Sequence, residues 1–138
     1  MTVAVLSIST LAQGGGKSTV IVYSLSTSTT LGQVRKPIFL DDKEIADVRP
    51  EHFFVAMIPA GKHTLNLKNK KFGGIERDFE AGKTYYLRID WRNNGMALVP
   101  QGFVIVPEEN GAFDVRQLKP IDTGNIKDKS LISLQLPK

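Results

Sequence analysis

The chain has 138 residues, which is enough for one domain whose core folds without a metal ion or a disulfide bond. It contains no cysteine, which excludes a disulfide framework, a zinc ribbon and a thiol nucleophile and predicts that no lipidated cysteine anchors it. Lysine and arginine number 18 against 14 aspartate and glutamate, and the resulting net charge of +4 is spread along the chain. From so even a distribution we expect no nucleic-acid partner.

Residues 2–12 (TVAVLSISTLA) form an uncharged, mostly apolar stretch that ends in small residues, as the apolar region of a secretory signal does. The stretch is too short to cross a membrane as a helix, which takes about 20 residues. No lysine or arginine precedes it, so either the start of the chain lies upstream or this stretch is a first strand. We expect residues 1–12 to be a signal-peptide remnant or apolar leader and residues 13–18 to be a glycine-rich linker. The protein is then exported to the periplasm or the cell surface.

Residues 14–19 (GGGKST) resemble the phosphate-binding loop of an ATPase in part. Leu11 stands where that loop has its first glycine. The run that follows, residues 19–23, is β-branched and aromatic, which favours a strand over the helix whose amides would hold the phosphates. Nucleotide binding through this segment is therefore an alternative to the linker with weaker support.

From residue 19 onward, short apolar runs alternate with turn residues, which is typical of an all-β domain. The runs predict strands at residues 19–25, 37–41, 44–48, 52–59, 62–68, 75–80, 83–91 and 96–107. Residues 42–43 are predicted to close a tight hairpin, and the most apolar run, residues 52–59, is predicted to be a central strand. We therefore expect an antiparallel β-sandwich of about seven to eight strands over residues 19–120.

Two turns share one pattern, Ala-Gly-Lys, at residues 60–62 and 81–83. Each places a glycine, Gly61 or Gly82, where a three-residue hairpin loop needs a positive φ. Pro59 suits the turn position whose φ is already near the value that its ring imposes. Both segments are predicted to close hairpins.

Residues 108–138 lack the regular succession of strands and turns predicted for the residues before them. Residues 108–118 carry apolar side chains every three residues, and Pro107 followed by two glutamates is typical of a helix start, which favours one short helix over a strand. Residues 121–138 are more polar and are predicted to be a C-terminal extension or tail. An apolar piece at residues 131–136 predicts an extra strand or a loosely held end.

Several stretches together resemble a known bacterial family. They are residues 20–23, 38–43 (IFLDDK), 53–64 (FFVAMIPAGKHT), 81–89 (AGKTYYLRI) and 98–119. In their order and spacing the chain resembles the family called domain of unknown function 2846. The resemblance implies a small exported protein with an immunoglobulin-like or prealbumin-like sandwich over residues 18–120, and it implies no activity. Relatives often have Asp-Gly-Lys in the first hairpin, where this chain has Asp-Asp-Lys at residues 41–43.

Few side chains have the chemistry for catalysis at neutral pH. His52 and His63 both lie in predicted strands, where we expect a structural role for each. The adjacent carboxylates at residues 41–42 and 108–109 diverge, so they predict no pair of glycosidase acids. We therefore expect no enzyme, no cofactor and no metal site.

The predicted strand at residues 83–91 has one face toward the core and one face that carries the candidate partner surface. Its alternation places Tyr85, Leu87, Ile89 and Trp91 toward the core. Tyr86 and Arg88 lie on the other face and form the candidate partner surface, with Tyr86 as the exposed aromatic. We expect a binding or structural module of the periplasm or cell envelope whose partner is a protein, a peptide or an envelope polymer. The alternatives are an enzyme with a site assembled from scattered residues and the nucleotide-binding protein considered above.

Overall fold

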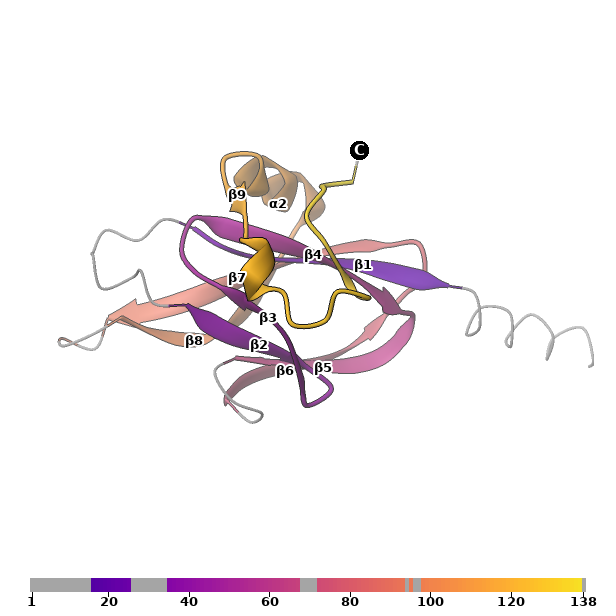
Figure 1. The fold of residues 1–138 in the computed structure, drawn as a ribbon, viewed down its shortest axis with the longest axis horizontal. Coiled ribbons are helices and arrows are strands. Elements are labelled where there is room, and N and C mark those ends of the chain that lie inside the picture. Colours follow the sequence, from indigo (N-terminus) through magenta and orange to yellow (C-terminus); the bar gives the residue numbers. More distant parts are fainter. Residues whose placement is uncertain (1–15, 26–34, 68–71, 94, 96–97, 138) are drawn as a thin grey trace, which may run out of the picture.

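The computed structural model describes residues 16–25, 35–67, 72–93, 95 and 98–137. In these residues two sheets stack face to face as a sandwich, and one short helix lies outside them (Figure 1). The predicted all-β sandwich is confirmed. The predicted leader, residues 1–12, and the first part of the predicted linker lie outside the described residues.

The first sheet has the strand order β10-β4-β1-β7-β8, with β9 also beside β4. Its strands are β1 (Lys17–Ser24), β4 (His52–Pro59), β7 (Thr84–Asn93), β8 (Leu98–Val106), β9 (Lys119–Pro120) and β10 (Ile132–Ser133). The second sheet has the order β3-β2-β5-β6. Its strands are β2 (Lys36–Leu40), β3 (Lys43–Val48), β5 (Gly61–Leu67) and β6 (Phe72–Phe79). Most neighbours are antiparallel as predicted, but β1 runs parallel to β7, and β9 runs parallel to β4.

Strand β1 occupies the middle of the first sheet, between β4 and β7. Its residues 20–23 are all buried, and each exposes at most 1% of its surface. Val20 and Val22 face the second sheet, while Ile21 and Tyr23 face the opposite side and contact a separate apolar cluster. A strand covered on both faces has a continuous apolar sequence, which explains why this run does not alternate with polar residues. The strand begins at Lys17, so the last two residues of the predicted linker belong to it.

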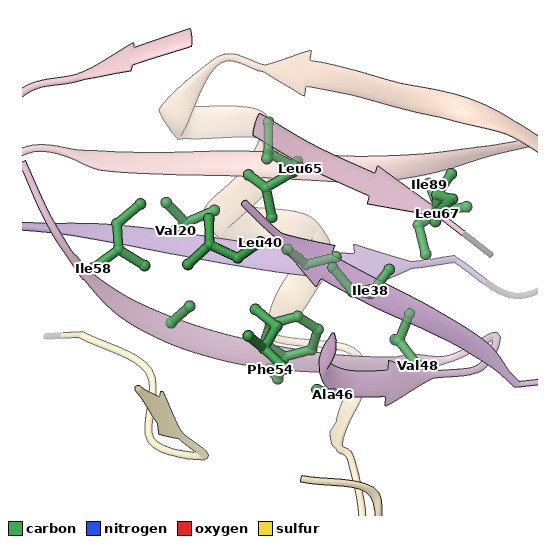
Figure 2. Close-up of a cluster of buried hydrophobic side chains, with 14 of the residues drawn as sticks. Val20, Ile38, Leu40, Ala46, Val48, Phe54, Ile58, Leu65, Leu67 and Ile89 are labelled. Carbon is green, nitrogen blue, oxygen red and sulfur yellow. The ribbon is translucent and has the colours of Figure 1, made fainter. Parts of the chain in front are cut away.

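The main core lies between the two sheets, where their inward side chains meet (Figure 2). From the first sheet it contains Val20, Phe54, Ile58, Leu87 and Ile89 among others, and from the second Ile38, Leu40, Val48, Leu65 and Leu67. Burial of such aliphatic and aromatic side chains is the dominant favourable term in folding. The predicted inward face of β7 is confirmed, because Tyr85 and Trp91 are partly buried against the same core.

The hairpin between β2 and β3 turns at Asp41 and Asp42, one residue earlier than predicted. Both residues have positive φ, 49° and 70°, which is the requirement of a type I′ turn. Asp41 is held there because its carboxylate accepts a hydrogen bond from the backbone N–H of Thr64 at 3.0 Å. Asp42 has no comparable bond among the described residues, so its left-handed conformation is uncompensated.

We expect Asp42→Gly to stabilise the domain by roughly 0.5–1 kcal/mol, because glycine adopts positive φ without the Cβ penalty. The free energy of unfolding from denaturant melts measures the change. Asp42→Ala is the matched control: it removes the same charge but keeps the Cβ, and it should give no gain. A destabilised glycine variant would contradict the type I′ assignment.

The two glycine turns are not hairpins. Gly61 is the first residue of β5 and follows the turn from β4, and Gly82 lies between β6 and β7, so each turn links strands of different sheets. Their φ values, 132° and 79°, confirm the predicted positive φ. The prediction of hairpins was wrong because a positive-φ glycine permits a sharp reversal whether the chain returns to the same sheet or crosses to the other. We call these two connections between the sheets arches. Both lie at the start of β1, where the N–H of Ala60 donates to the carbonyl of Gly16 and the N–H of Gly82 donates to the carbonyl of Lys17.

The predicted C-terminal extension is part of the domain as far as Pro137. Ile121 is buried in the main core, and β10 pairs with β4. A short 3₁₀ turn, η2 (Thr123–Asn125), precedes a segment in which the N–H groups of Lys127 and Asp128 both donate to the carbonyl of Ile45. The segment thus covers the β3 edge of the second sheet and the β4 edge of the first.

Asp128 holds this segment through its side chain. The carboxylate accepts hydrogen bonds from Lys43 Nζ at 2.9 Å, from Ser130 Oγ at 2.6 Å and from the Ser130 backbone N–H at 3.0 Å. These bonds, that of Lys43 first, lower the pKa of Asp128 from its ordinary 3.8 to about 2. Because the folded pKa is below the unfolded one, the ionised carboxylate stabilises the fold above about pH 4, and this contribution is lost as the pH falls toward about 2.

We expect Asp128→Asn to lower the free energy of unfolding by about 1–2 kcal/mol at pH 7, with the exposure of Lys43 keeping the loss below the full linkage value. The difference from the unsubstituted protein should shrink as the pH falls from 4 to 2. Urea melts across this range measure it. Lys43→Met is the companion variant, since it removes the main cause and should reduce the same pH dependence. A difference that does not change with pH would contradict the assignment.

Candidate functional site

Helix α2 (Glu108–Val115) confirms the predicted short helix and covers the outer face of the first sheet (Figure 1). It follows Pro107 directly and carries two glutamates in its first turn, where the helix dipole favours negative charge. Gly111 faces the sheet: a Cβ at this position would lie 2.2 Å from Cγ of Tyr86. The absence of a side chain is what allows the helix to approach β7 so closely.

A second apolar cluster lies beneath α2. It consists of Ile21, Tyr23, Phe53, Val55, Tyr86, Val106 and Val115, with Val104, Ala112, Leu118 and Leu136 partly buried against it. The hydroxyl of Tyr23 donates a hydrogen bond to Asp114 Oδ2 on the helix at 2.7 Å. Burial raises the pKa of Tyr23 well above its ordinary value, Asp114 raises it further, and nearby Arg88 opposes the shift. Tyr23 therefore stays a neutral donor that fixes α2 on the sheet.

A pocket of about 250 Å³ opens between α2, the start of β7 and the C-terminal segment, by which we mean residues 121–137. We call it the α2 pocket. Its lining residues are Thr84 and Tyr86 from β7, Glu108, Ala112, Val115 and Arg116 from the helix and its C-cap, and Leu136 and Pro137 from the C-terminal segment. The lining combines aliphatic walls with two hydroxyls and one charge of each sign. Concave sites that orient small ligands have this mixture.

Glu108 and Arg116 are the two charged groups of the α2 pocket. Neither makes an ion pair or a side-chain hydrogen bond with another residue in the described part of the chain. Burial raises the pKa of Tyr86, the carboxylate of Glu108 raises it further, and the guanidinium of Arg116 lowers it. Both charges therefore act on the phenol at the pocket floor. Their positions at opposite ends of α2 also suit the helix dipole, so stability alone accounts for part of their placement.

The predicted exposure of Tyr86 is wrong. The residue exposes only 6% of its surface because α2 covers the outer face of β7. Arg88, its companion in the predicted partner surface, is half-buried and lies near the hydroxyl of Tyr23. The two do not form an open surface, and a role of either in contacting a partner stays a prediction. Among the described residues, Tyr86 is one of those that line the α2 pocket.

The most exposed large apolar side chain of the described residues is Phe113, at 60%, on the outer side of α2. A second hollow of about 420 Å³ is lined by Leu25, Glu51, Asp114, Gln117 and Leu118. This hollow borders residue 25, after which the chain is not described until residue 35. The α2 pocket is the better-defined site although its volume is smaller.

Both histidines have structural partners. His63 places Nδ1 2.5 Å from Asp41 Oδ2 and Nε2 2.7 Å from the carbonyl oxygen of Pro59, so both ring nitrogens are occupied. It ties the β2–β3 hairpin to the arch after β4. His52 Nδ1 lies 2.9 Å from the carbonyl oxygen of Pro50. The described residues hold no group of three or more histidine, aspartate or glutamate side chains arranged to bind a metal ion.

The phosphate-loop alternative lacks its helix. Lys17, Ser18 and Thr19 open strand β1, and Thr19 donates its backbone N–H to the carbonyl of Lys83 instead of offering it to a ligand. Residues 14 and 15 lie outside the described residues.

Comparison with known proteins identifies the family. Residues 15–102, more than half of the chain, match the family described as Protein of unknown function (DUF2846). The chain belongs to the DUF2846 family. The match covers β1 through most of β8 and ends before α2, so the helix that forms one wall of the α2 pocket lies outside the matched part of this DUF2846 protein. Neither a curated protein nor a solved structure matches the chain.

The α2 pocket could not be predicted from the sequence. Glu108 was identified only as one of two glutamates at a helix start and Leu136 as part of a tail, and Arg116 was not identified at all. The one available signal was spacing, because Ala112, Val115 and Arg116 follow Glu108 by four, seven and eight positions and so share one side of a helix. None of the helices in the described ranges is long and apolar enough to cross a membrane.

Proposed function

We propose that this DUF2846 protein is an exported, non-catalytic binding module of the bacterial periplasm or cell surface, and that it binds its ligand in the α2 pocket. The observation that carries the proposal is the pocket itself, whose floor hydroxyls and two end charges have no partner among the described residues. Buried polar groups of a fold are ordinarily paired, so the buried Tyr86 phenol left without a partner in a concave site favours recognition, and Glu108 and Arg116 are exposed charges that a ligand can reach.

Several features support binding over catalysis. A hydrolytic or acid–base site needs a positioned group of matched pKa beside its nucleophile or water. In the α2 pocket the titratable groups are Glu108, Arg116 and Tyr86, and no histidine is present. Burial raises the pKa of the Tyr86 phenol further above neutral pH, so the phenol stays protonated and is a poorer base or nucleophile there. The arrangement suits orientation of a bound molecule.

Export rests on the composition of residues 2–12, whose apolar character and small closing residues are those of a secretory signal. Fractionation of bacterial cells that express the full chain with a C-terminal tag tests it. We expect the tagged protein in the periplasmic or surface fraction and shorter by about the first dozen residues. Retention of the uncleaved chain with cytoplasmic markers would overturn this part of the proposal and leave the binding part standing.

Binding is tested by ¹⁵N-edited NMR of the domain with a panel of free amino acids, short peptides, mono- and disaccharides and dicarboxylates. We expect at least one compound to shift the amides of β7 and α2 and to leave those of β2 and β3 in place. Ala112→Phe should fill the pocket and abolish the shifts. Asn110→Phe is the matched control, since it adds a similar ring to the exposed side of the same helix. Shifts unaffected by Ala112→Phe, or none with any compound, would overturn the proposal.

A further inference from the structure

The ligand class can be inferred from where the two charges of the α2 pocket lie. Arg116 follows Glu108 by eight positions, and an α-helix rises about 1.5 Å per residue, so their backbones stand about 12 Å apart along the axis. They are too far apart to neutralise one another without a large excursion of both side chains, and no ion pair joins them. One end of the pocket is therefore suited to a cation and the other to an anion.

The floor between the charges is suited to peptide groups. The hydroxyls of Thr84 and Tyr86 make no hydrogen bond to any residue of the described ranges. Every fully buried polar side-chain atom of these ranges has a partner, so the unpartnered Tyr86 hydroxyl is not fully buried, and Tyr86 lines the pocket. A hydroxyl both donates and accepts, and it can therefore bond the C=O or the N–H of an amide. Ala112, Val115 and Leu136 supply aliphatic surface for small side chains.

We infer that the α2 pocket binds a short peptide of about three residues with free ends, its ammonium group at Glu108 and its carboxylate at Arg116. This inference rests on the proposed binding function. An extended chain spans about 3.3–3.6 Å per residue, so about three residues match the separation of the two charges. A single amino acid carries both charges on one carbon and cannot reach both ends. A monoanion or a monocation would leave one pocket charge without a partner.

Calorimetric titration with trialanine tests the inference, with N-acetyl-trialanine and trialanine amide as probes of each end. We expect trialanine to bind at least tenfold more tightly than either blocked form. Arg116→Gln should remove the preference for the free carboxylate and retain that for the free amine. Glu108→Gln should do the reverse. Glu109→Gln and Lys119→Gln are the matched controls, because both residues are exposed and neither lines the pocket. Both should bind as the unsubstituted protein does.

The results distinguish a failure of the peptide inference from a failure of the proposed binding function. If trialanine does not bind while another compound of the NMR panel still occupies the pocket, the peptide inference is wrong and the binding function stands. Equal affinity for free and blocked peptides, or end preferences that survive both glutamine substitutions, also overturns the inference. If trialanine binds but Ala112→Phe leaves its affinity unchanged, the ligand lies elsewhere and both proposals fall.

Discussion

Truncating Leu87 or Tyr86 to alanine, one at a time, should destabilise the domain strongly in both cases. Leu87 has no exposed surface and contacts the core between the sheets, whereas Tyr86 lies under α2 on the other face of the same strand. Loss of a buried leucine lowers the free energy of unfolding by about 2–5 kcal/mol, since transfer and cavity terms add. For Tyr86, which borders the α2 pocket, we expect about 2–4 kcal/mol. Denaturant melts of the two variants measure both faces of β7.

Phe113→Ala is the control for this pair. It removes an aromatic ring of similar size from the exposed side of α2 and should change stability by less than about 0.5 kcal/mol. A strong loss for Leu87→Ala with almost none for Tyr86→Ala would show that α2 does not cover the strand in solution. The α2 pocket would then lack its helical wall.

The second large effect is expected at Gly111. Alanine is ordinarily better than glycine in a helix by about 1 kcal/mol, yet Gly111→Ala should destabilise the domain by about 1–3 kcal/mol. The new methyl group would meet Cγ and Cβ of Tyr86 at 2.2 and 2.5 Å, and these atoms are at the rigid base of the side chain. Either the helix must lift from β7 or the tyrosine must leave its place.

A double substitution separates the clash from any other cause. In a Tyr86→Ala background the Gly111→Ala change should be neutral or stabilising, because the contact is gone and the helix preference remains. Asn110→Ala, on the exposed side of α2, should be neutral or slightly stabilising in either background. If Gly111→Ala destabilises the protein equally with and without the tyrosine ring, the close approach of α2 to β7 is not its cause.

The sequence predicted those features that depend on periodicity within one strand. The alternation of Tyr85, Leu87, Ile89 and Trp91 identified the inward face of β7, and the β-branched and aromatic run at residues 19–23 identified β1 as a strand. Periodicity shows which side chains share a face, but it does not show what covers that face. Tyr86 was therefore assigned to solvent, although a helix that begins 22 positions later covers it.

Connections between strands were harder to predict for a related reason. The Ala-Gly-Lys turns at Gly61 and Gly82 show where the chain reverses, and the positive φ at each was predicted correctly. The strand pairing is decided by contacts between distant parts of the sequence, such as β1 with β7. The α2 pocket has the same dependence, because its walls come from β7, α2 and the C-terminal segment. No local pattern brings these three together.

The central place of β1 has a consequence for the order in which the chain can fold. The first described strand to be synthesised pairs with β4, about 35 residues later, and with β7, about 65 residues later. Such pairings between distant residues slow folding, since the entropy of closing long loops must be lost before the contacts form. A growing chain that ends before residue 84 therefore keeps one edge of β1 open. The domain should acquire stable structure only late in synthesis, and until then β1 is a natural target for chaperones that bind extended apolar segments.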